Sequence, residues 1–393
     1  MRVAIVHHWF VTRGGGERVA ECIASLFPSA EIYTLMADEA GIPAGLMDRR
    51  MHTSFLQRIP LARRFHRHML PLYPAATANL DLTGFDLVLS SDSGPIKGVR
   101  VSPGATHICY CHSPMRYLYD GYDSYRSQMG PVTRAIFTAT ASRVRKSDLE
   151  AASRVTAFIA NSRYVSQRIR RVYGRESVVI HPPIDVSRGM IARQPGDHYL
   201  CAGRLVGYKH TELIIEACQR LGRRLRIVGA GPESARLRAM AGPEAVFLGE
   251  LSTEDLWREY SSCRALLFAA DEDFGMVPLE AQACGRPVIA YGAGGSLETV
   301  RGVGVDRTGV HFARQTVESV MEGIVEFEAA DDRGEFVPQS IQAWAEQFAT
   351  SVFLDHMRAF LIDSVPGVEA IMPPSPSQTS PRSELSTEHQ PSG

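Results

Sequence analysis

The fold is constrained most strongly by a series of short apolar runs that do not alternate with polar residues. Stretches with apolar residues at helical spacing separate these runs. Strands that are apolar on both faces and alternate with helices are typical of a parallel sheet covered on both sides. The pattern occurs twice and predicts an α/β fold class with two consecutive open α/β units. The runs are residues 2–6, 85–90, 107–110, 156–161 and 177–180, and then 199–203, 225–229, 245–249, 265–268 and 287–290.

The length of 393 residues is sufficient for two such domains, since a domain typically has roughly 100–200 residues. We place the first domain at 1–185, ending in a linker near residues 181–185, and the second at 186–339. Residues 340–365 carry one apolar helical stripe and are predicted to form a C-terminal helix that docks on a domain. Residues 366–393 are rich in Pro and Ser and are predicted to be a disordered tail.

The cysteines and the N-terminus bear on the cellular compartment. The seven cysteines are an odd number without a C-x-x-C pair, and most lie in apolar runs, as in 199–202. We expect them to be reduced core residues of a cytosolic protein. The N-terminus lacks the apolar stretch of a secretory signal, and no window reaches about 18 uninterrupted apolar residues. We therefore expect neither export nor a membrane span.

The formal net charge of −1 conceals two oppositely charged halves. Residues 1–185 contain 23 Lys or Arg against 15 Asp or Glu, and residues 186–393 contain 19 against 28. A basic half joined to an acidic half indicates an anionic partner for the basic one, such as phosphate groups, a membrane surface or nucleic acid. No aromatic-basic platform or groove-reading motif is present, so we do not expect nucleic acid.

The strongest local signal is the segment 271–281, Asp-Glu-Asp-Phe-Gly-Met-Val-Pro-Leu-Glu-Ala, which follows the run 265–268. Gly275 allows close approach of the backbone, and Met276 and Val277 supply free N–H groups where a helix begins. Such a helix N-terminus binds an anion, most naturally a phosphate. Glu280, one turn into the helix, is suitably placed to bind a ribose diol. On spacing alone, a solvated acidic loop with Glu280 on an exposed helix face is equally consistent.

Two further motifs argue against other protein classes. Neither Gly14-Gly15-Gly16 nor Gly229-Ala230-Gly231 completes G-x-G-x-x-G, which disfavours a nicotinamide oxidoreductase. The triplet Asp271-Glu272-Asp273 has the D-x-D form of a metal site, but a single triplet is a weak match. We therefore expect no metal and no cofactor.

These segments together resemble the retaining GT-B glycosyltransferases of family four. The resemblance in the second half rests on Glu272-x7-Glu280, on Arg204 with Lys209, and on the segments 228–232, 283–290 and 294–298. In the first half it rests on residues 14–17 and on 110–117, Tyr-Cys-His-Ser-Pro-Met-Arg-Tyr. The latter is similar to bacterial mannosyltransferases that build lipid-linked exopolysaccharide or O-antigen units. The resemblance implies two Rossmann-like domains facing across a cleft, with the C-terminal helix returning to the N-terminal domain.

The resemblance also implies roles for the matching residues. Arg204 and Lys209 would pair with the donor diphosphate, and Glu272 would bind hydroxyls of the donor sugar. His112 would lie beside the transferred sugar, so these four residues are the predicted catalytic group. Glu280 would bind the ribose, and the other donor-binding residues would offer their backbone. Those are Gly15, Gly16, Phe274, Gly275, Met276 and Val277.

The implied reaction is metal-independent retaining transfer of a hexose, with same-face attack through an oxocarbenium-like transition state. The implied donor is a nucleotide sugar, and the resemblance favours GDP-mannose. The implied acceptor is a polyprenyl-diphosphate-linked oligosaccharide such as cellobiosyl-diphosphopolyprenol. A UDP-sugar transferase of the same fold and a non-catalytic sugar-nucleotide-binding or scaffold protein remain alternatives.

The segment 49–72 interleaves arginines with apolar residues. Such a stretch can lie in a membrane interface, with its apolar side chains buried shallowly and its arginines on anionic headgroups. A hairpin packed on its own domain is the alternative. We expect peripheral attachment to the cytoplasmic face of the inner membrane, on the acceptor side. The predicted membrane or acceptor contacts are Arg58, Arg63, Arg64, Phe65 and Arg67.

Overall fold

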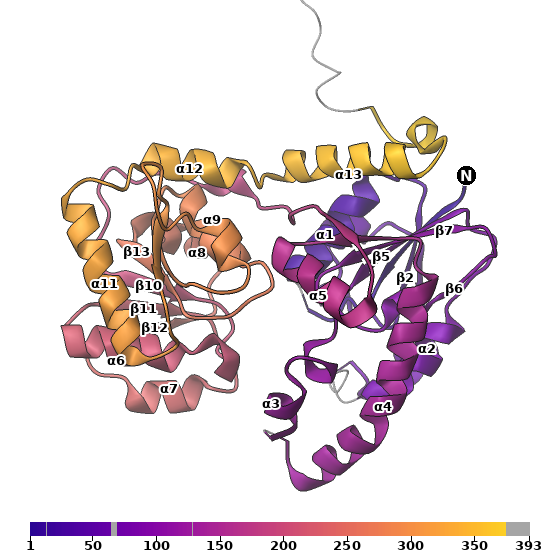
Figure 1. Ribbon diagram of the computed structural model, residues 1–393, viewed down its shortest axis with the longest axis horizontal. Coiled ribbons are helices and arrows are strands. Elements are labelled where there is room, and N and C mark those ends of the chain that lie inside the picture. The colour runs from indigo at the N-terminus through magenta and orange to yellow at the C-terminus, as the bar shows by residue number, and fades with distance from the viewer. Residues whose placement is uncertain (13, 64–68, 128, 375–393) are drawn as a thin grey trace, which may run out of the picture.

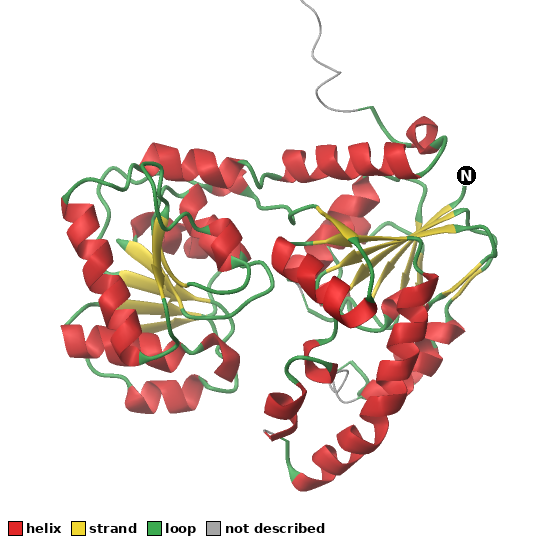
Figure 2. Ribbon diagram, in the orientation of Figure 1, coloured by secondary structure: helices red, strands yellow, loops and turns green. Residues whose placement is uncertain are grey.

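The computed structural model describes residues 1–12, 14–63, 69–127 and 129–374 and forms two domains side by side (Figure 1). Each domain has a parallel sheet with helices on both faces (Figure 2), as the non-alternating apolar runs predict. Helices α12 (Pro338–Glu346) and α13 (Thr350–Ser364) pass over both domains along one edge of the molecule.

The N-terminal sheet has the strand order β3-β2-β1-β5-β7-β8-β9 and is parallel throughout its recorded pairs. Helices α1 and α13 pack on one face, and α2 and α4 pack on the other. The strands are β1 (Val3–His7), β2 (Glu31–Thr34), β3 (Met51–Thr53), β5 (Leu87–Asp92), β7 (Thr106–Cys111), β8 (Ala157–Ala160) and β9 (Ser177–Val179). The helices are α1 (Gly15–Ser25), α2 (Tyr73–Asn79), α3 (Tyr122–Ser127), α4 (Pro131–Arg154) and α5 (Arg163–Tyr173). A separate two-stranded sheet pairs β4 (Asp81–Leu82) with β6 (Arg100–Val101).

The C-terminal sheet has the order β12-β11-β10-β13-β14-β15, again parallel. One face is covered by α6, α7 and α11 and the other by α8 and α9. The strands are β10 (Tyr199–Ala202), β11 (Leu225–Val228), β12 (Ala245–Gly249), β13 (Ala265–Phe268), β14 (Val288–Tyr291) and β15 (Gly309–Phe312). The helices are α6 (Thr211–Leu221), α7 (Ser234–Met240), α8 (Thr253–Ser262), α9 (Met276–Ala283), α10 (Ser296–Thr299) and α11 (Val317–Asp332).

Both sheets reverse their strand order at a corresponding place. The first strand of each domain lies between its second strand on one side and a later strand on the other: β1 neighbours β5, and β10 neighbours β13. Ligands of open α/β sheets bind beyond the carboxyl ends of the strands at this switch point. The topology therefore marks the ends of β1, β5, β10 and β13 as the places to look for a site.

The prediction of two Rossmann-like domains is confirmed, and each predicted strand is present. Five further strands of the described residues were missed: β2, β3 and β15 of the two main sheets, and β4 and β6 of the small one. α1 begins at Gly15, within the glycine segment 14–16. The seven cysteines are all free and buried, as expected for reduced core residues. Among the described residues, none of the helices combines the length and apolarity that a membrane crossing needs.

The C-terminal segment differs from the single predicted helix. It forms two helices, α12 and α13, with a break at 347–349 where Ala349 forms a β-bridge with Ile184. The second helix returns to the N-terminal core through Phe353, Met357 and Leu361. The first part of the segment predicted as a disordered tail is structured: residues 368–371 form a 3-10 turn, and Val368 is buried in the same core. The rest of that prediction, 375–393, lies outside the described residues.

The docking of α13 can be tested with two adjacent residues. Leu361 is fully buried against the N-terminal core, whereas Ile362 is 41% exposed. We expect Leu361→Ala to lower the free energy of unfolding by about 2–5 kcal/mol, because it leaves a cavity in the core. Ile362→Ala should change it by no more than about 0.5 kcal/mol. Urea unfolding followed by circular dichroism measures both, and equal effects would show that α13 does not depend on this contact.

Candidate active site

A cavity of about 590 Å³ lies between the two domains. From the N-terminal domain it is lined by the start of α1, by Ser93 after β5 and by His112 after β7. From the C-terminal domain it is lined by the loop that joins β13 to α9. The carboxyl ends of strands in both sheets thus meet at one cavity, as the two switch points require.

The loop after β13 is held in a tight conformation by glycines. Gly275 precedes α9 with φ of +88°, in the left-handed region that glycine adopts without strain. Gly295 lies against the loop from behind, where a Cβ atom would come within 2.2 Å of the Phe274 Cα. The Gly295 amide also donates to the Glu272 carbonyl at 2.8 Å. Met276 and Val277, the first residues of α9, line the cavity, and the first N–H groups of a helix have no partner within it.

An ion pair joins two of the predicted catalytic residues. The Lys209 Nζ lies 3.0 Å from Glu272 Oε1, and both side chains are mostly buried. Burial alone would lower the pKa of Lys209, but the Glu272 carboxylate outweighs it and raises the pKa above its usual value. Lys209 is therefore a fixed cation at the base of the loop.

The remaining donor-side predictions lie behind the cavity wall. Glu280 accepts a hydrogen bond from the Tyr260 hydroxyl at 2.7 Å, and burial raises its pKa although that bond opposes the rise. Arg204 is exposed. Neither residue is among those that line the main cavity, while Gly15, Gly16, His112, Glu272 and residues 274–277 all are. Most of the predicted site residues thus line one cavity, whereas Arg204, Lys209 and Glu280 do not line it.

His112 faces the loop from the opposite domain. Its Nε2 lies 2.8 Å from the Ser91 Oγ, and the Ser91 Oγ lies 3.1 Å from Nδ1 of His7. Burial lowers the pKa of His112 to about 3, so the ring is neutral at physiological pH. A neutral imidazole offers a ligand one donor or one acceptor, but no charge.

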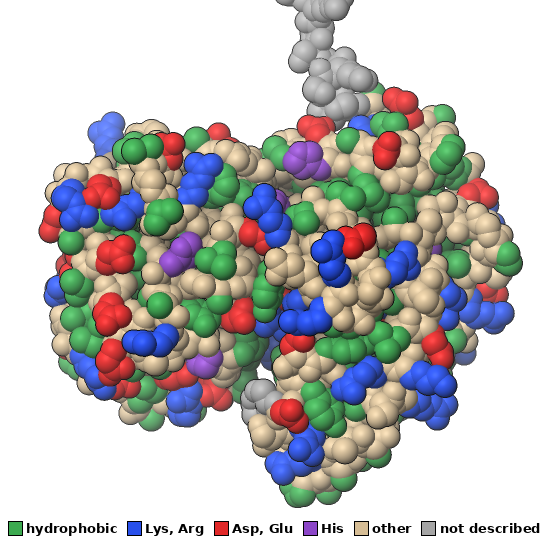
Figure 3. Space-filling model, viewed as in Figure 1, with side chains coloured by type: hydrophobic (Ala, Val, Ile, Leu, Met, Phe, Trp, Pro, Cys, Tyr) green, Lys and Arg blue, Asp and Glu red, His purple; other side chains and the backbone are tan. Residues whose placement is uncertain are grey.

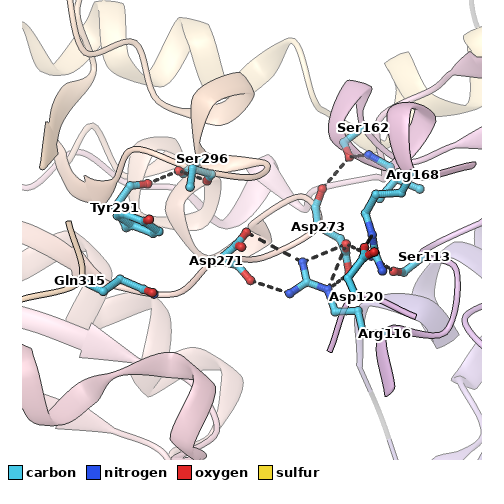
Figure 4. A network of polar contacts seen from close by, with 12 residues as sticks. Ser113, Arg116, Asp120, Ser162, Arg168, Asp271, Asp273, Tyr291, Ser296 and Gln315 are labelled. Carbon is cyan, nitrogen blue, oxygen red and sulfur yellow. Dashed lines mark hydrogen bonds and ion pairs between the residues drawn. The ribbon is translucent and has the colours of Figure 1, made fainter. Parts of the chain in front are cut away.

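Two arginines of the N-terminal domain hold the loop from across the cleft (Figure 4). Arg116 donates from Nε to Asp273 Oδ2 at 3.1 Å and from Nη1 to the Asp271 carbonyl at 2.9 Å. Arg168 donates from Nη1 to Asp273 Oδ1 at 2.7 Å and from Nε to Asp120 at 2.7 Å. Sequence reasoning missed both arginines as site residues. Arg116 belongs to the 110–117 motif, which could have pointed to it. Nothing in the sequence marked Arg168 as a site residue, because it lies in a helix with several other arginines.

Further contacts close the cleft around these arginines. The Ser162 Oγ donates to the Asp273 carbonyl at 2.5 Å. Glu298 accepts from the backbone N–H groups of Arg163 and Tyr164 at 2.9 and 3.0 Å, so a carboxylate of one domain caps α5 of the other. A Cβ atom on Gly15 would lie 2.5 Å from the Met276 Sδ. Gly15 thus lets α1 approach α9 closely.

The acidic triplet is already paired with cations. Asp273 is held by two arginines, Glu272 by Lys209, and the Asp271 side chain lies 3.9 Å from Arg116. Within the described ranges, no group of three His, Cys, Asp or Glu side chains is arranged to hold a metal ion. The arrangement is instead suited to an anionic ligand that carries hydroxyl groups, since it offers a lysine, free helix N–H groups and carboxylate oxygens.

Comparison with known proteins agrees with this geometry. Residues 13–188 match the family model described as "Glycosyltransferase Family 4", and residues 193–339 match the one described as "Glycosyl transferases group 1". Both domains thus match glycosyltransferase families. The two matches meet at the linker between the domains, so each family model corresponds to one of the two sheets that form the cavity.

The glycosyltransferase match extends to curated relatives. Over 171 residues the chain is 32% identical to a GDP-mannose-dependent alpha-(1-6)-phosphatidylinositol monomannoside mannosyltransferase of Mycolicibacterium smegmatis, covering 35% of this chain and 45% of that protein. Over 99 residues it is 36% identical to a GDP-mannose-dependent alpha-mannosyltransferase of Corynebacterium glutamicum, covering 25% and 24%. The chain therefore spans less than half the length of these two relatives.

Solved structures extend the likeness to both domains. HepE of Anabaena in complex with UDP has a TM-score of 0.65 at 16% identity, covering 92% of this chain and all of that one. The sucrose-phosphate synthase of Thermosynechococcus elongatus has a TM-score of 0.66 at 16% identity, covering 92% and 99%. At this identity the likeness shows the fold, which is the predicted GT-B arrangement.

Two of the five predicted membrane contacts can be placed in the structure, and neither lines the main cavity. Arg58 and Arg63 are exposed and line a surface groove together with Leu61. Leu56 is fully buried and Ile59 packs against the N-terminal core, so part of this segment does serve its own domain. The other predicted residues, Arg64, Phe65 and Arg67, lie outside the described residues.

The arginine contacts across the cleft can be tested through Asp273. We expect Asp273→Asn to destabilise the closed arrangement by about 1–3 kcal/mol, because Arg168 is only 2% exposed and would lose a charged partner. Small-angle scattering should then give a larger radius of gyration than for the wild type. Asp255→Asn removes a surface carboxylate of the same domain and should leave the radius unchanged. Equal radii for all three proteins would contradict the role of Asp273.

Proposed function

We propose that the protein is a retaining glycosyltransferase that moves a hexose from a nucleoside diphosphate sugar to a lipid-linked oligosaccharide. The observation that carries the proposal is a single cavity with Glu272 and the start of α9 on one side and His112 on the other, together with Lys209, which does not line the cavity but is paired with Glu272 at 3.0 Å. A diphosphate and a sugar placed between these groups would meet a cation, helix N–H donors and a hydroxyl acceptor at once.

The reaction needs stabilisation of a leaving diphosphate. Charge moves onto the diphosphate as the sugar–phosphate bond breaks, so donors fixed at that position lower the barrier more than they tighten substrate binding. Lys209 is such a donor, with its position set by Glu272. Arg204, which is exposed beside a small cavity that Lys209 also lines, supplies a second cation when the donor is bound. Glu272 keeps its other carboxylate oxygen for the sugar hydroxyls.

GDP-mannose is the proposed donor. Two relatives with 32% and 36% identity over the matched segments carry GDP-mannose dependence in their names. In this chain Glu280 of α9 would bind the ribose, since its carboxylate is held in place by the hydroxyl of Tyr260 in α8. The acceptor is proposed to be a polyprenyl-diphosphate-linked oligosaccharide of surface polysaccharide assembly, bound on the N-terminal side of the cleft.

A membrane contact would serve such an acceptor. Leu61 is 66% exposed and has a φ of +60°, which is strained for a leucine. It lines a surface groove together with Arg58, Arg63 and Asp38, and Asp38 forms an ion pair with Arg63 at 3.5 Å. This groove fits shallow insertion into an anionic bilayer, and we propose that the protein is peripheral on the cytoplasmic face of the inner membrane.

Transfer can be measured with radiolabelled GDP- and UDP-sugars and a membrane lipid extract as acceptor. We expect incorporation from GDP-mannose, and a fall of at least about 100-fold in kcat for Lys209→Ala because a fixed donor to the leaving group is lost. Glu272→Ala should cause a similar fall.

Lys146 provides the matched control, since it is 81% exposed on α4 and remote from the cavity. Lys146→Ala should transfer at the wild-type rate. Full activity in Lys209→Ala and Glu272→Ala would contradict the proposed site. Incorporation from UDP-sugars alone would show that the donor is a UDP-sugar and not GDP-mannose.

Membrane binding is testable by flotation with liposomes. We expect binding to vesicles that contain anionic lipid and weak binding to neutral ones. Reversing two charges, as in Arg58→Glu with Arg63→Glu, should weaken binding roughly 30-fold, at about 1 kcal/mol or more for each residue. The control reverses two exposed arginines of the C-terminal domain, Arg224 and Arg258. Equal binding to both vesicle types, unchanged by the double substitution, would exclude this attachment.

A further inference from the structure

A serine hydroxyl joins two neutral histidines beside the cavity. Ser91 lies in β5, next to His7 at the end of β1, and the two residues are in register in the sheet. The Ser91 Oγ lies 3.1 Å from Nδ1 of His7 and 2.8 Å from Nε2 of His112. Only His112 of the two histidines lines the cavity.

The hydrogen bonds from His7 through Ser91 to His112 couple the protonation of the two rings. Among the described residues, the two histidines are the only recorded partners of the Ser91 hydroxyl, so its one hydrogen goes to one ring and it accepts from the other. One of the two facing nitrogens therefore carries a hydrogen and the other does not. Since burial lowers the pKa of both rings to about 3, each ring is neutral and carries one hydrogen in total. The tautomer of His7 thus dictates the tautomer of His112.

Glu17 provides the bias that selects between the two states. It lies in the first turn of α1, with Oε1 4.0 Å from Nε2 of His7. That nitrogen is buried and has no hydrogen-bond partner among the described residues. A carboxylate favours a hydrogen on the nearer nitrogen of a buried ring, because a lone pair there would face its negative charge. The Ser91 backbone also acts on His7, but it carries no net charge.

The tautomer of His7 affects the cavity through Ser91 and His112. With its hydrogen on Nε2, His7 presents a bare Nδ1, and Ser91 donates to it. Ser91 then accepts from Nε2 of His112, which leaves Nδ1 of His112 bare. That atom has no partner recorded among the described residues, and His112 is only partly buried. The titratable groups that act on His112 are His7, which is neutral, and the carboxyl groups of Glu17 and of Asp273 in the facing loop.

We propose that Glu17, His7 and Ser91 are positioning residues that fix the tautomer of His112, so that its Nδ1 meets the transferred sugar as a hydrogen-bond acceptor. The proposal rests on the proposed function. A lone pair on Nδ1 of His112 accepts from a sugar hydroxyl. It also directs negative potential at the sugar ring, which becomes cationic in the transition state. The opposite tautomer of His112 would direct an N–H group at the sugar ring and would destabilise the positive charge that develops there.

The tautomer can be read directly by NMR of the protein with ¹⁵N-labelled histidine, with the His112 signals assigned from His112→Asn. We expect the wild type to show a hydrogen on Nε2 and a bare Nδ1 at His112. Ser91→Ala should abolish this preference, and Glu17→Gln should give a mixture of tautomers because the charge is lost while the shape is kept. Ser91→Ala should also lower kcat for transfer roughly 10-fold with little change in KM for the donor.

Ser90 is the matched control. It lies one residue earlier in β5, and its Oγ contacts Nε2 of another buried histidine, His107, at 2.9 Å. Ser90→Ala should leave the His112 signals and kcat unchanged. A hydrogen on Nδ1 of wild-type His112, or an unchanged tautomer in both Ser91→Ala and Glu17→Gln, would overturn the proposal. If no donor sugar is transferred but the tautomer pattern appears as expected, the positioning stands and the proposed function fails.

Discussion

The cleft depends on the pairing of one buried guanidinium group. Arg168 is 2% exposed, and a cation removed from water in this way is stable only if carboxylates and carbonyls surround it. Its own domain supplies Asp120, Ser113 and the Pro114 carbonyl, and the facing domain supplies Asp273. The loop that carries Asp273 also carries Glu272 and the start of α9. The position of the candidate donor site is therefore set partly by the opposite domain.

The same closeness explains where glycine is required. Gly295 backs the loop at a distance where a side chain would collide with the backbone of Phe274, and Gly15 faces the flexible end of Met276. A collision with backbone displaces the loop, whereas a methionine side chain can move aside at lower cost. These two positions therefore contribute differently: Gly295 sets the shape of the site, and Gly15 sets how closely the domains approach.

Sequence patterns predicted the elements whose determinants are local. Fully buried strands such as β13 and β14 are continuous apolar runs, and the helix start at Gly275–Met276 has its own glycine. The edge strand β3 has no buried residue, so its pattern gave no apolar run to detect. The break between α12 and α13 was missed because it depends on a bridge to Ile184, which lies 165 residues away from Ala349. Arg168 was missed for the same reason: its partners are distant in sequence, and its spacing is that of an ordinary basic helix.

The charge asymmetry of the sequence has a structural counterpart at the cleft. Several of the polar contacts that join the domains run from cations or backbone N–H groups of the N-terminal half to carboxylates of the C-terminal half, as for Arg116 with Asp273 and for α5 with Glu298. Such contacts attract the domains to each other and weaken as salt rises. They also neutralise the N-terminal cations nearest the loop, so an anionic ligand must draw its charge partners from elsewhere. Under the proposed function, Lys209 and Arg204 of the C-terminal half would supply them, whereas Arg58 and Arg63 line a separate surface groove of the N-terminal half. Lys and Arg side chains are spread over the visible face of both domains (Figure 3).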